Sequence, residues 1–211
     1  YKRFPLFSSW ADFLEGLGTQ LPQLLFAAFY GVEVAGWFAL GQRVMGAPLN
    51  IVVNSVAQVY FGEAARLPKD DPKAMRRLFL KLTSRLALIG GLPVAVICAL
   101  APWFFTFVFG PEWETAGRYV QILGIMFAVR FTIVPLFHTL SVLERQDLYA
   151  IWEATRLALV IGGLLAGKAL GVSHINAVAV YTLSMLIAYV LLWGIIWRAL
   201  TSKLKAGRSE P

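Results

Sequence analysis

The chain has 211 residues, of which 58% are hydrophobic and only 15% are charged, and its mean hydropathy is +0.67. A soluble domain carries about a quarter charged residues, so this composition excludes an ordinary soluble globular protein. The net charge of +7 does not indicate nucleic-acid binding, because the basic residues cluster in the connections between apolar segments, as in membrane proteins.

Six apolar segments follow one another along the chain, and a helix of about 20 residues is enough to cross a bilayer. Two runs carry no charge at all, 24 residues from Leu86 to Phe109 and 29 residues from Ala169 to Trp197. No segment shows a strand signal. The sequence therefore predicts an all-α polytopic membrane protein, a six-transmembrane-helix bundle with spans at 9–30, 32–66, 77–109, 116–143, 149–170 and 173–200.

The first span carries polar side chains at helical spacing. Glu15, Thr19 and Gln23 share an arc of about 80° with Asp12 when successive residues are about 100° apart. Polar groups are unfavourable against lipid, so this stripe is expected to face protein or a water-filled cavity. Glu15 and Gln23 are therefore candidate binding residues.

The second span has a longer polar stripe that begins at Arg43. Asn50, Asn54 and Gln58 lie within an arc of about 80° around this arginine, and the rest of the helix is apolar. A cavity-facing role for these residues is one interpretation. The other is hydrogen bonding between helices, which contributes under about 1 kcal/mol per contact.

Arg130 lies about 21 Å along the fourth span from Ala116, so it is expected near the middle of the membrane. A charge near the middle of a bilayer costs at least about 2.5–3.5 kcal/mol, so Arg130 and Arg43 are expected to line a functional cavity. Counted along their own helices, the two arginines lie within about one turn of the same depth. The alternative is that they form buried salt bridges with Glu15 or Glu153.

The last two spans contain fewer candidates. Glu153 and Arg156, three residues apart in the fifth span, are expected to form a structural ion pair. The sixth span has no charge between Lys168 and Arg198 and is expected to face lipid or to pack passively. The sequence has no HExxH, P-loop, GxSxG or metal-ligand spacing, so neither a catalytic site nor a metal or other cofactor is expected.

The basic residues also predict an orientation. Thirteen of the 19 lysines and arginines lie in the connections on one side, two in those on the other side, and four within spans. Because positive residues accumulate on the cytoplasmic side, both ends are expected to be cytoplasmic. The chain opens on YKRFPLFSS as though cut from a longer protein, whereas its polar tail, LTSKLKAGRSEP, is expected to be a true terminus.

Several motifs occur in order along the first three spans. They are YKRFPLFSS, FYGVEVAGWFALGQRV, QVYFGEAARL and FVFGPEWETAG. In this order and spacing, the chain resembles the C-terminal half of the polysaccharide transporter family, the O-antigen and exopolysaccharide flippases. This family belongs to the multidrug/oligosaccharidyl-lipid/polysaccharide exporter superfamily. The resemblance extends from Tyr1 to about Leu148.

This resemblance implies a non-enzymatic, multi-pass protein of the bacterial cytoplasmic membrane. The chain would be one six-helix lobe of a two-lobed flippase whose N-terminal lobe is missing here. Its partners would be membrane lipids and an undecaprenyl-diphosphate-linked oligosaccharide, translocated by alternating access. Arg43 and Arg130 would contact the diphosphate, because guanidinium groups suit phosphate oxygens. Asn50, Asn54 and Gln58 would bond sugar hydroxyls.

Two other classes of function stay open. One is a membrane-embedded polymerase or ligase acting on lipid-linked sugars, which normally needs a sizeable outer loop. The longest outward loop expected here is only about residues 109–115, and this argues against such an enzyme. The other is an exporter of drugs or of peptidoglycan precursor in the same superfamily, which the residues of this half do not distinguish from a polysaccharide flippase.

Overall fold

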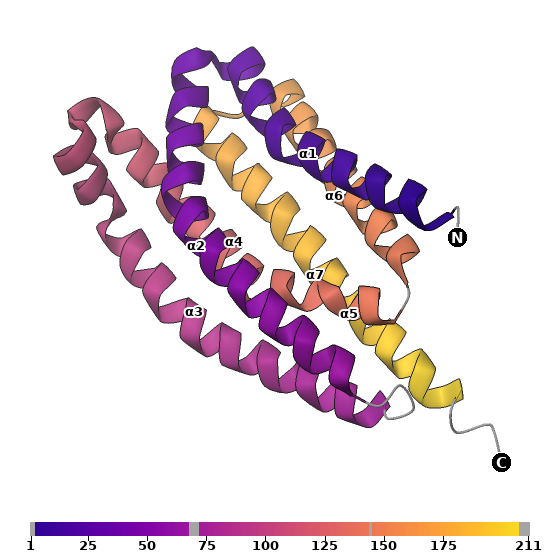
Figure 1. The fold of residues 1–211 in the computed structure, drawn as a ribbon. Helices are drawn as coiled ribbons and strands as arrows, with labels where there is room; N and C mark the ends of the chain where they lie inside the picture. The colour runs from indigo at the N-terminus through magenta and orange to yellow at the C-terminus, as the bar shows by residue number, and fades with distance from the viewer. Residues whose placement is uncertain (1–2, 68–71, 144, 207–211) are drawn as a thin grey trace.

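The computed structural model describes the backbone of residues 3–67, 72–143 and 145–206, and the side chains of 16–67, 73–143 and 145–202. Within these ranges all regular structure is helical, which confirms the predicted all-α polytopic bundle (Figure 1). The elements are α1 (Arg3–Tyr30), α2 (Val32–Arg66), α3 (Pro72–Phe109), η1 (Pro111–Trp113), α4 (Glu114–Ile133), η2 (Val134–Phe137), α5 (His138–Val142), α6 (Gln146–Ala169) and α7 (His174–Ala206).

Most helices are long and apolar enough to cross a membrane. Over the described residues, five segments meet both conditions of length and composition, and α1 is a 28-residue helix described mainly by its backbone. Their number makes the chain a multi-pass membrane protein. The five segments are Val32–Arg66, Lys73–Phe109, Pro111–Val142, Gln146–Ala169 and His174–Ser202.

The segment predicted as the fourth span is divided in the structure. The helix α4 ends at Ile133, a 3-10 turn containing Pro135 follows, and the short helix α5 begins at His138. Proline lacks a backbone N–H and its ring crowds the preceding turn, so it interrupts an α-helix. The chain leaves the direction of α4 at this point and turns toward α6 (Figure 1).

The helices do not all pack against their neighbours in sequence. Contacts are extensive between α3 and α4, between α6 and α7, and between α1 and α6, and α4 also packs on α7 and α2. By contrast, α2 and α3 are not closely packed, and a small cluster joins Val53 of α2, Leu86 of α3 and Phe131 of α4. In this arrangement, α7 lies near the middle of the bundle (Figure 1).

The interface between α3 and α4 requires small residues. A Cβ atom on Gly117 would lie 2.6 Å from the Cα of Pro102 and 2.8 Å from the carbonyl oxygen of Ala101, both backbone atoms of α3. A Cβ atom on Gly124 would overlap the sulfur of Cys98. Only glycine allows the two helices to approach this closely, as is common in membrane bundles.

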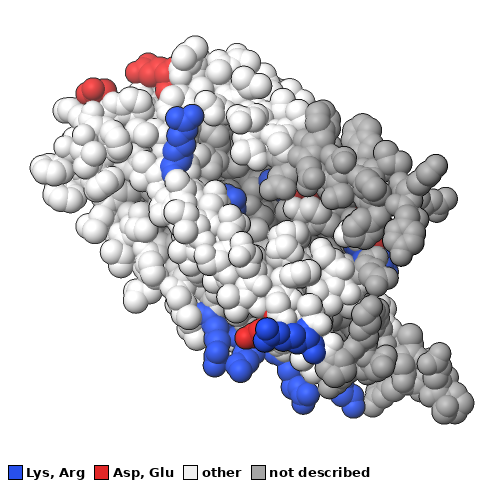
Figure 2. Space-filling model, viewed as in Figure 1, with Lys and Arg blue, Asp and Glu red and all other residues white. Residues whose placement is uncertain are grey.

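Charged side chains gather at the two ends of the molecule, and the body between them is largely uncharged (Figure 2). Lysines and arginines predominate at the end where α2 ends and α3 begins, with an acidic side chain among them, and further acidic side chains lie at the opposite end. The exposed basic residues of the first end include Arg66, Lys73, Arg76, Arg77 and Lys81, and the exposed acidic residues of the other include Glu112 and Glu114.

Candidate functional site

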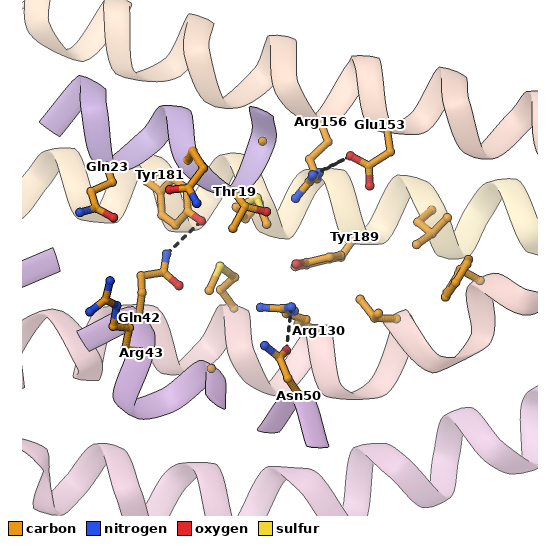
Figure 3. Close-up of a pocket in the computed structure, with 18 of the residues that line it drawn as sticks. Thr19, Gln23, Gln42, Arg43, Asn50, Arg130, Glu153, Arg156, Tyr181 and Tyr189 are labelled. Atoms are coloured by element: carbon orange, nitrogen blue, oxygen red, sulfur yellow. Dashed lines mark hydrogen bonds and ion pairs between the residues drawn. The ribbon is translucent and has the colours of Figure 1, made fainter. Parts of the chain in front are cut away.

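A cavity of about 370 Å³ lies between α1, α2, α4, α6 and α7. Figure 2 shows the molecule hollowed near its centre, with basic side chains visible inside the hollow. Polar side chains from all five helices point into this space (Figure 3). Its charged and amide-bearing residues are Gln20, Gln23, Gln42, Arg43, Asn50, Arg130, Glu153 and Arg156.

Four of the residues predicted from the sequence meet at this cavity. Gln23 comes from α1, Arg43 and Asn50 come from α2, and Arg130 comes from α4 (Figure 3). They lie up to 107 positions apart in the chain, between Gln23 and Arg130. The fold therefore brings together side chains that were proposed only because polar groups are unfavourable inside apolar helices.

The other three predicted residues are not placed in the cavity. Asn54 and Gln58 are exposed and lie outside its lining, and the side chain of Glu15 falls outside the described residues. The lining residues of α2 run from Phe38 to Asn50, about 18 Å at 1.5 Å per residue, so Asn54 lies one turn beyond the end of the cavity.

Arg130 is held by a hydrogen bond across the cavity wall, since its Nη2 donates to the Oδ1 of Asn50 over 2.9 Å. Asn50 is seven residues beyond Arg43, so the two arginines lie about 10 Å apart along the bundle rather than within one turn. The prediction of equal depth assumed that the second and fourth spans begin at the same depth in the membrane. In the structure, Gly41 of α2 lies against Val120 of α4, which shifts the register.

The predicted ion pair between Glu153 and Arg156 is confirmed. Nη2 and Nε of Arg156 donate to the Oε2 of Glu153 at 2.6 and 3.0 Å. Glu153 is 1% exposed and Arg156 8% exposed, yet both line the cavity. The guanidinium carbon lies 5.5 Å from the ring centre of Trp152, and a side chain on Gly18 would overlap the guanidinium group. Arg156 is therefore a third cavity arginine.

The helix α7 contributes to the cavity, contrary to the expectation that the sixth span faces lipid or packs passively. Tyr181, Met185 and Tyr189 recur every four residues, so they share one helix face, and all three line the cavity. The hydroxyl of Tyr181 accepts a hydrogen bond of 3.0 Å from the Nε2 of Gln42. The two tyrosines at this spacing are the sequence signal that could have identified the face.

The described lining carries an excess of positive charge. Arg43, Arg130 and Arg156 are cationic and Glu153 is anionic, so the net formal charge of these four residues is +2. No cluster of three or more histidine, cysteine, aspartate or glutamate side chains suited to a metal ion occurs among the described residues. With guanidinium, amide and phenol groups, the cavity is equipped to bind an anion that carries hydroxyl groups.

Comparisons with known proteins identify the family to which the chain belongs. Residues 3–118, more than half of the chain, match the sequence model of a family described as polysaccharide biosynthesis protein. The chain belongs to this family. Its membership confirms the resemblance to the polysaccharide transporters that the ordered motifs indicated. The match covers α1 to the start of α4, including Arg43 and Asn50, whereas Arg130 and Arg156 lie beyond it.

Two curated relatives match a larger part of the chain than the family model does. The teichuronic acid biosynthesis protein TuaB of Bacillus subtilis is 27% identical over 146 residues, 68% of this chain and 29% of TuaB. The lipopolysaccharide biosynthesis protein WzxC of Escherichia coli is 28% identical over 162 residues, 74% of this chain and 32% of WzxC. The chain thus spans about a third of the length of these family members. No solved structure matches it.

Proposed function

We propose that the chain is one lobe of a flippase that moves an undecaprenyl-diphosphate-linked oligosaccharide across the bacterial cytoplasmic membrane by alternating access. The observation that carries this proposal is the cavity inside an apolar bundle, with three arginines and one paired glutamate among its described lining residues. Membership of the polysaccharide biosynthesis family supports the substrate class.

The charge of the cavity suits a lipid-linked diphosphate. Such a head group carries about two negative charges, and moving unpaired charge into a low-dielectric interior is strongly unfavourable. The net formal charge of +2 on the four charged lining residues offsets this penalty. Arg130 is held in place by Asn50, and its remaining N–H groups suit phosphate oxygens. Arg43 is exposed at the cavity and makes no hydrogen bond with a described residue.

The oligosaccharide would bond the amide and phenol groups around the arginines. Gln23, Gln42 and Asn50 offer donors and acceptors for sugar hydroxyls, and Tyr181 and Tyr189 add hydroxyls from α7 (Figure 3). These residues surround the arginines from three helices. We therefore place the diphosphate at the arginines and the first sugars at the amides.

The remaining polar residues of the two stripes are proposed to face the other lobe of the transporter. Asn54 and Gln58 lie on an exposed face of α2, where lipid would leave their amides unsatisfied. The chain spans about a third of its relatives, so we propose that an N-terminal lobe, or the water between two lobes, covers this face and Glu15. The basic end shown in Figure 2 would be cytoplasmic, as would both chain ends.

A polymerase or ligase is less well supported. The only described acidic residue of the cavity is Glu153, which is engaged by Arg156, so it does not offer a free general base. The connections at the acidic end are also short, because Gly31 alone separates α1 from α2 and η1 joins α3 to α4. Neither provides room for a catalytic loop.

Export of surface polysaccharide by the full-length protein tests the proposal. Arg43→Ala with Arg130→Ala should reduce export at least about tenfold, because two charge-assisted contacts of about 1.5–3 kcal/mol each are lost. Lysine at either position should restore export in part, since it keeps the positive charge but lacks the planar guanidinium group that donates two parallel hydrogen bonds. Arg118→Ala is the matched control, because Arg118 is exposed and pairs with Glu114 outside the cavity. Normal export from the double variant, at normal protein levels, would overturn the proposal.

A further inference from the structure

A second hollow, of about 460 Å³, lies between α2 and α3, in the half of the molecule where α2 ends and α3 begins. The hollow exists because α2 and α3 are not closely packed against each other, although Val53 of α2 and Leu86 of α3 share a small cluster with Phe131 of α4. Its walls are largely apolar, and Val59 and Ile89 are exposed in it. We call this space the α2–α3 groove; it is separate from the arginine-lined cavity and shares no residue with it.

Three charged side chains line the groove among the described residues: Glu63 from α2 and Lys81 and Arg85 from α3. All three are exposed, and none forms an ion pair or side-chain hydrogen bond with a described residue. Lys81 and Arg85 are four residues apart, so they lie one above the other on the same face of α3. The groove therefore offers two unpaired cations and one unpaired anion beside an apolar surface.

The order of these charges along the groove follows from the helix register. The helices α2 and α3 run in opposite directions, and Val53 and Leu86 belong to one small cluster with Phe131 of α4. Counted from this cluster at 1.5 Å per residue toward the end of the bundle, Arg85 lies at about 1.5 Å, Lys81 at about 7.5 Å and Glu63 at about 15 Å. The order from the interior outward is thus apolar wall, two cations, then one anion.

We propose that the α2–α3 groove binds a zwitterionic phospholipid with an ammonium head group, of the phosphatidylethanolamine class. Such a lipid has the complementary order of groups from the bilayer interior outward: acyl chain, phosphate, ammonium. Its phosphate contacts Lys81 and Arg85, whose long side chains reach toward the head-group region, and its ammonium contacts Glu63. An acyl chain then lies along Leu86 and Ile89.

Charge complementarity distinguishes this lipid from an anionic one. Phosphatidylglycerol presents the same phosphate to Lys81 and Arg85, but its glycerol head group is uncharged. It therefore offers Glu63 no cation and leaves the repulsion between its phosphate and that carboxylate uncompensated. Glu63 therefore selects for an ammonium head group. The inference rests on neither the proposed transport activity nor the orientation in the membrane, because both leaflets of a bilayer present their head groups outward.

Native mass spectrometry of the full-length protein tests this assignment. The protein is released from nanodiscs made of equal parts phosphatidylethanolamine and phosphatidylglycerol, and the lipids that stay bound are counted. The wild-type protein should retain more phosphatidylethanolamine. Glu63→Gln should lower the ratio of phosphatidylethanolamine to phosphatidylglycerol about fivefold, the equivalent of one partly exposed ion pair. Lys81→Gln with Arg85→Gln should reduce retention of both lipids.

Two control variants lie outside the groove: Lys73→Gln at the same end and Glu112→Gln at the other. Neither should change the amount or the ratio of bound lipids. The ratio is measured within one sample, so it remains informative even if Glu63→Gln lowers the yield of folded protein. An unchanged ratio in Glu63→Gln, a wild-type preference for phosphatidylglycerol, or equal loss of lipid in Lys73→Gln would overturn the assignment.

Discussion

One side of α4 packs closely through glycine, whereas the opposite side carries large side chains that line the cavity. Gly117 faces α3, where its missing side chain lets the backbones touch, and α3 carries no charge between Leu86 and Phe109. Met126 and Arg130 lie on the opposite face of α4, about 180–220° around the helix from Gly117, and line the cavity.

This difference shows how a membrane bundle holds a charged side chain in place. One face of α4 is fixed by close packing, which fills space and tolerates no added atom. The other face leaves room for a ligand, and its polar groups bond one another across the gap, as Arg130 and Asn50 do. Rigidity on one side therefore positions a cation on the other, and each side makes distinct predictions.

The largest effect is expected on the cavity side, from Arg156→Ala. The change removes the guanidinium group from Glu153, whose side chain is almost fully buried. Breaking a buried ion pair by removing one partner destabilises proteins by about 3–5 kcal/mol. Unfolding of the detergent-solubilised protein by heat or denaturant measures this loss. Glu153→Gln combined with Arg156→Gln should recover most of the stability, and unchanged stability in Arg156→Ala would show that the pair is not buried.

A smaller loss is expected on the packed side, from Gly117→Ala. The new methyl group would meet backbone atoms of Ala101 and Pro102, which move only if α3 and α4 separate. Overpacking of this kind costs about 1–3 kcal/mol in unfolding free energy. Gly91→Ala is the matched control on α3, because a Cβ atom there meets nothing within 4 Å. If both variants melt at the same temperature, the two helices are not in close contact.

The smallest effect is expected from Tyr181→Phe. This change removes the hydroxyl that accepts a hydrogen bond from Gln42 and leaves the amide beside a polar cavity. The unfolding free energy should fall by about 0.5–1.5 kcal/mol, the usual contribution of one such bond. In a double-mutant cycle with Gln42→Leu, the second change should add little. Additive losses would mean that the two side chains act independently.

The fold was largely predictable because a long run of apolar residues is a strong signal for a membrane-spanning helix. Charged loops between long apolar runs indicated where the chain turns back, but not where each helix begins, since α1 begins at Arg3 and α3 at Pro72 rather than at residues 9 and 77. The division of the predicted fourth span into α4, η2 and α5 was not predicted, since Pro135 is one proline among several, and Pro48 and Pro93 stay within continuous helices. Whether a proline breaks a helix depends on the packing around it, which local sequence does not show.

The candidate site was predictable only in part. Arg43, Asn50 and Arg130 were identified because charge and amide groups are costly in an apolar helix. Helical periodicity gives the face of a residue but not the length of the cavity, so the same argument also selected Asn54, which lies one turn beyond the described lining. Tyr181 was missed because a tyrosine in an uncharged helix resembles an ordinary core residue.

Direct binding of a lipid-linked diphosphate is the measurement that tests the central claim. The purified full-length protein is titrated with undecaprenyl-diphosphate oligosaccharide, and the dissociation constant is compared between wild type, Arg130→Ala and Asn54→Ala. The arginine cavity predicts about 10–100-fold weaker binding by Arg130→Ala, since a charge-assisted contact contributes about 1.5–3 kcal/mol, and less than about a twofold change for Asn54→Ala. Equal affinity of all three proteins would contradict the assignment of this cavity to the anionic head group.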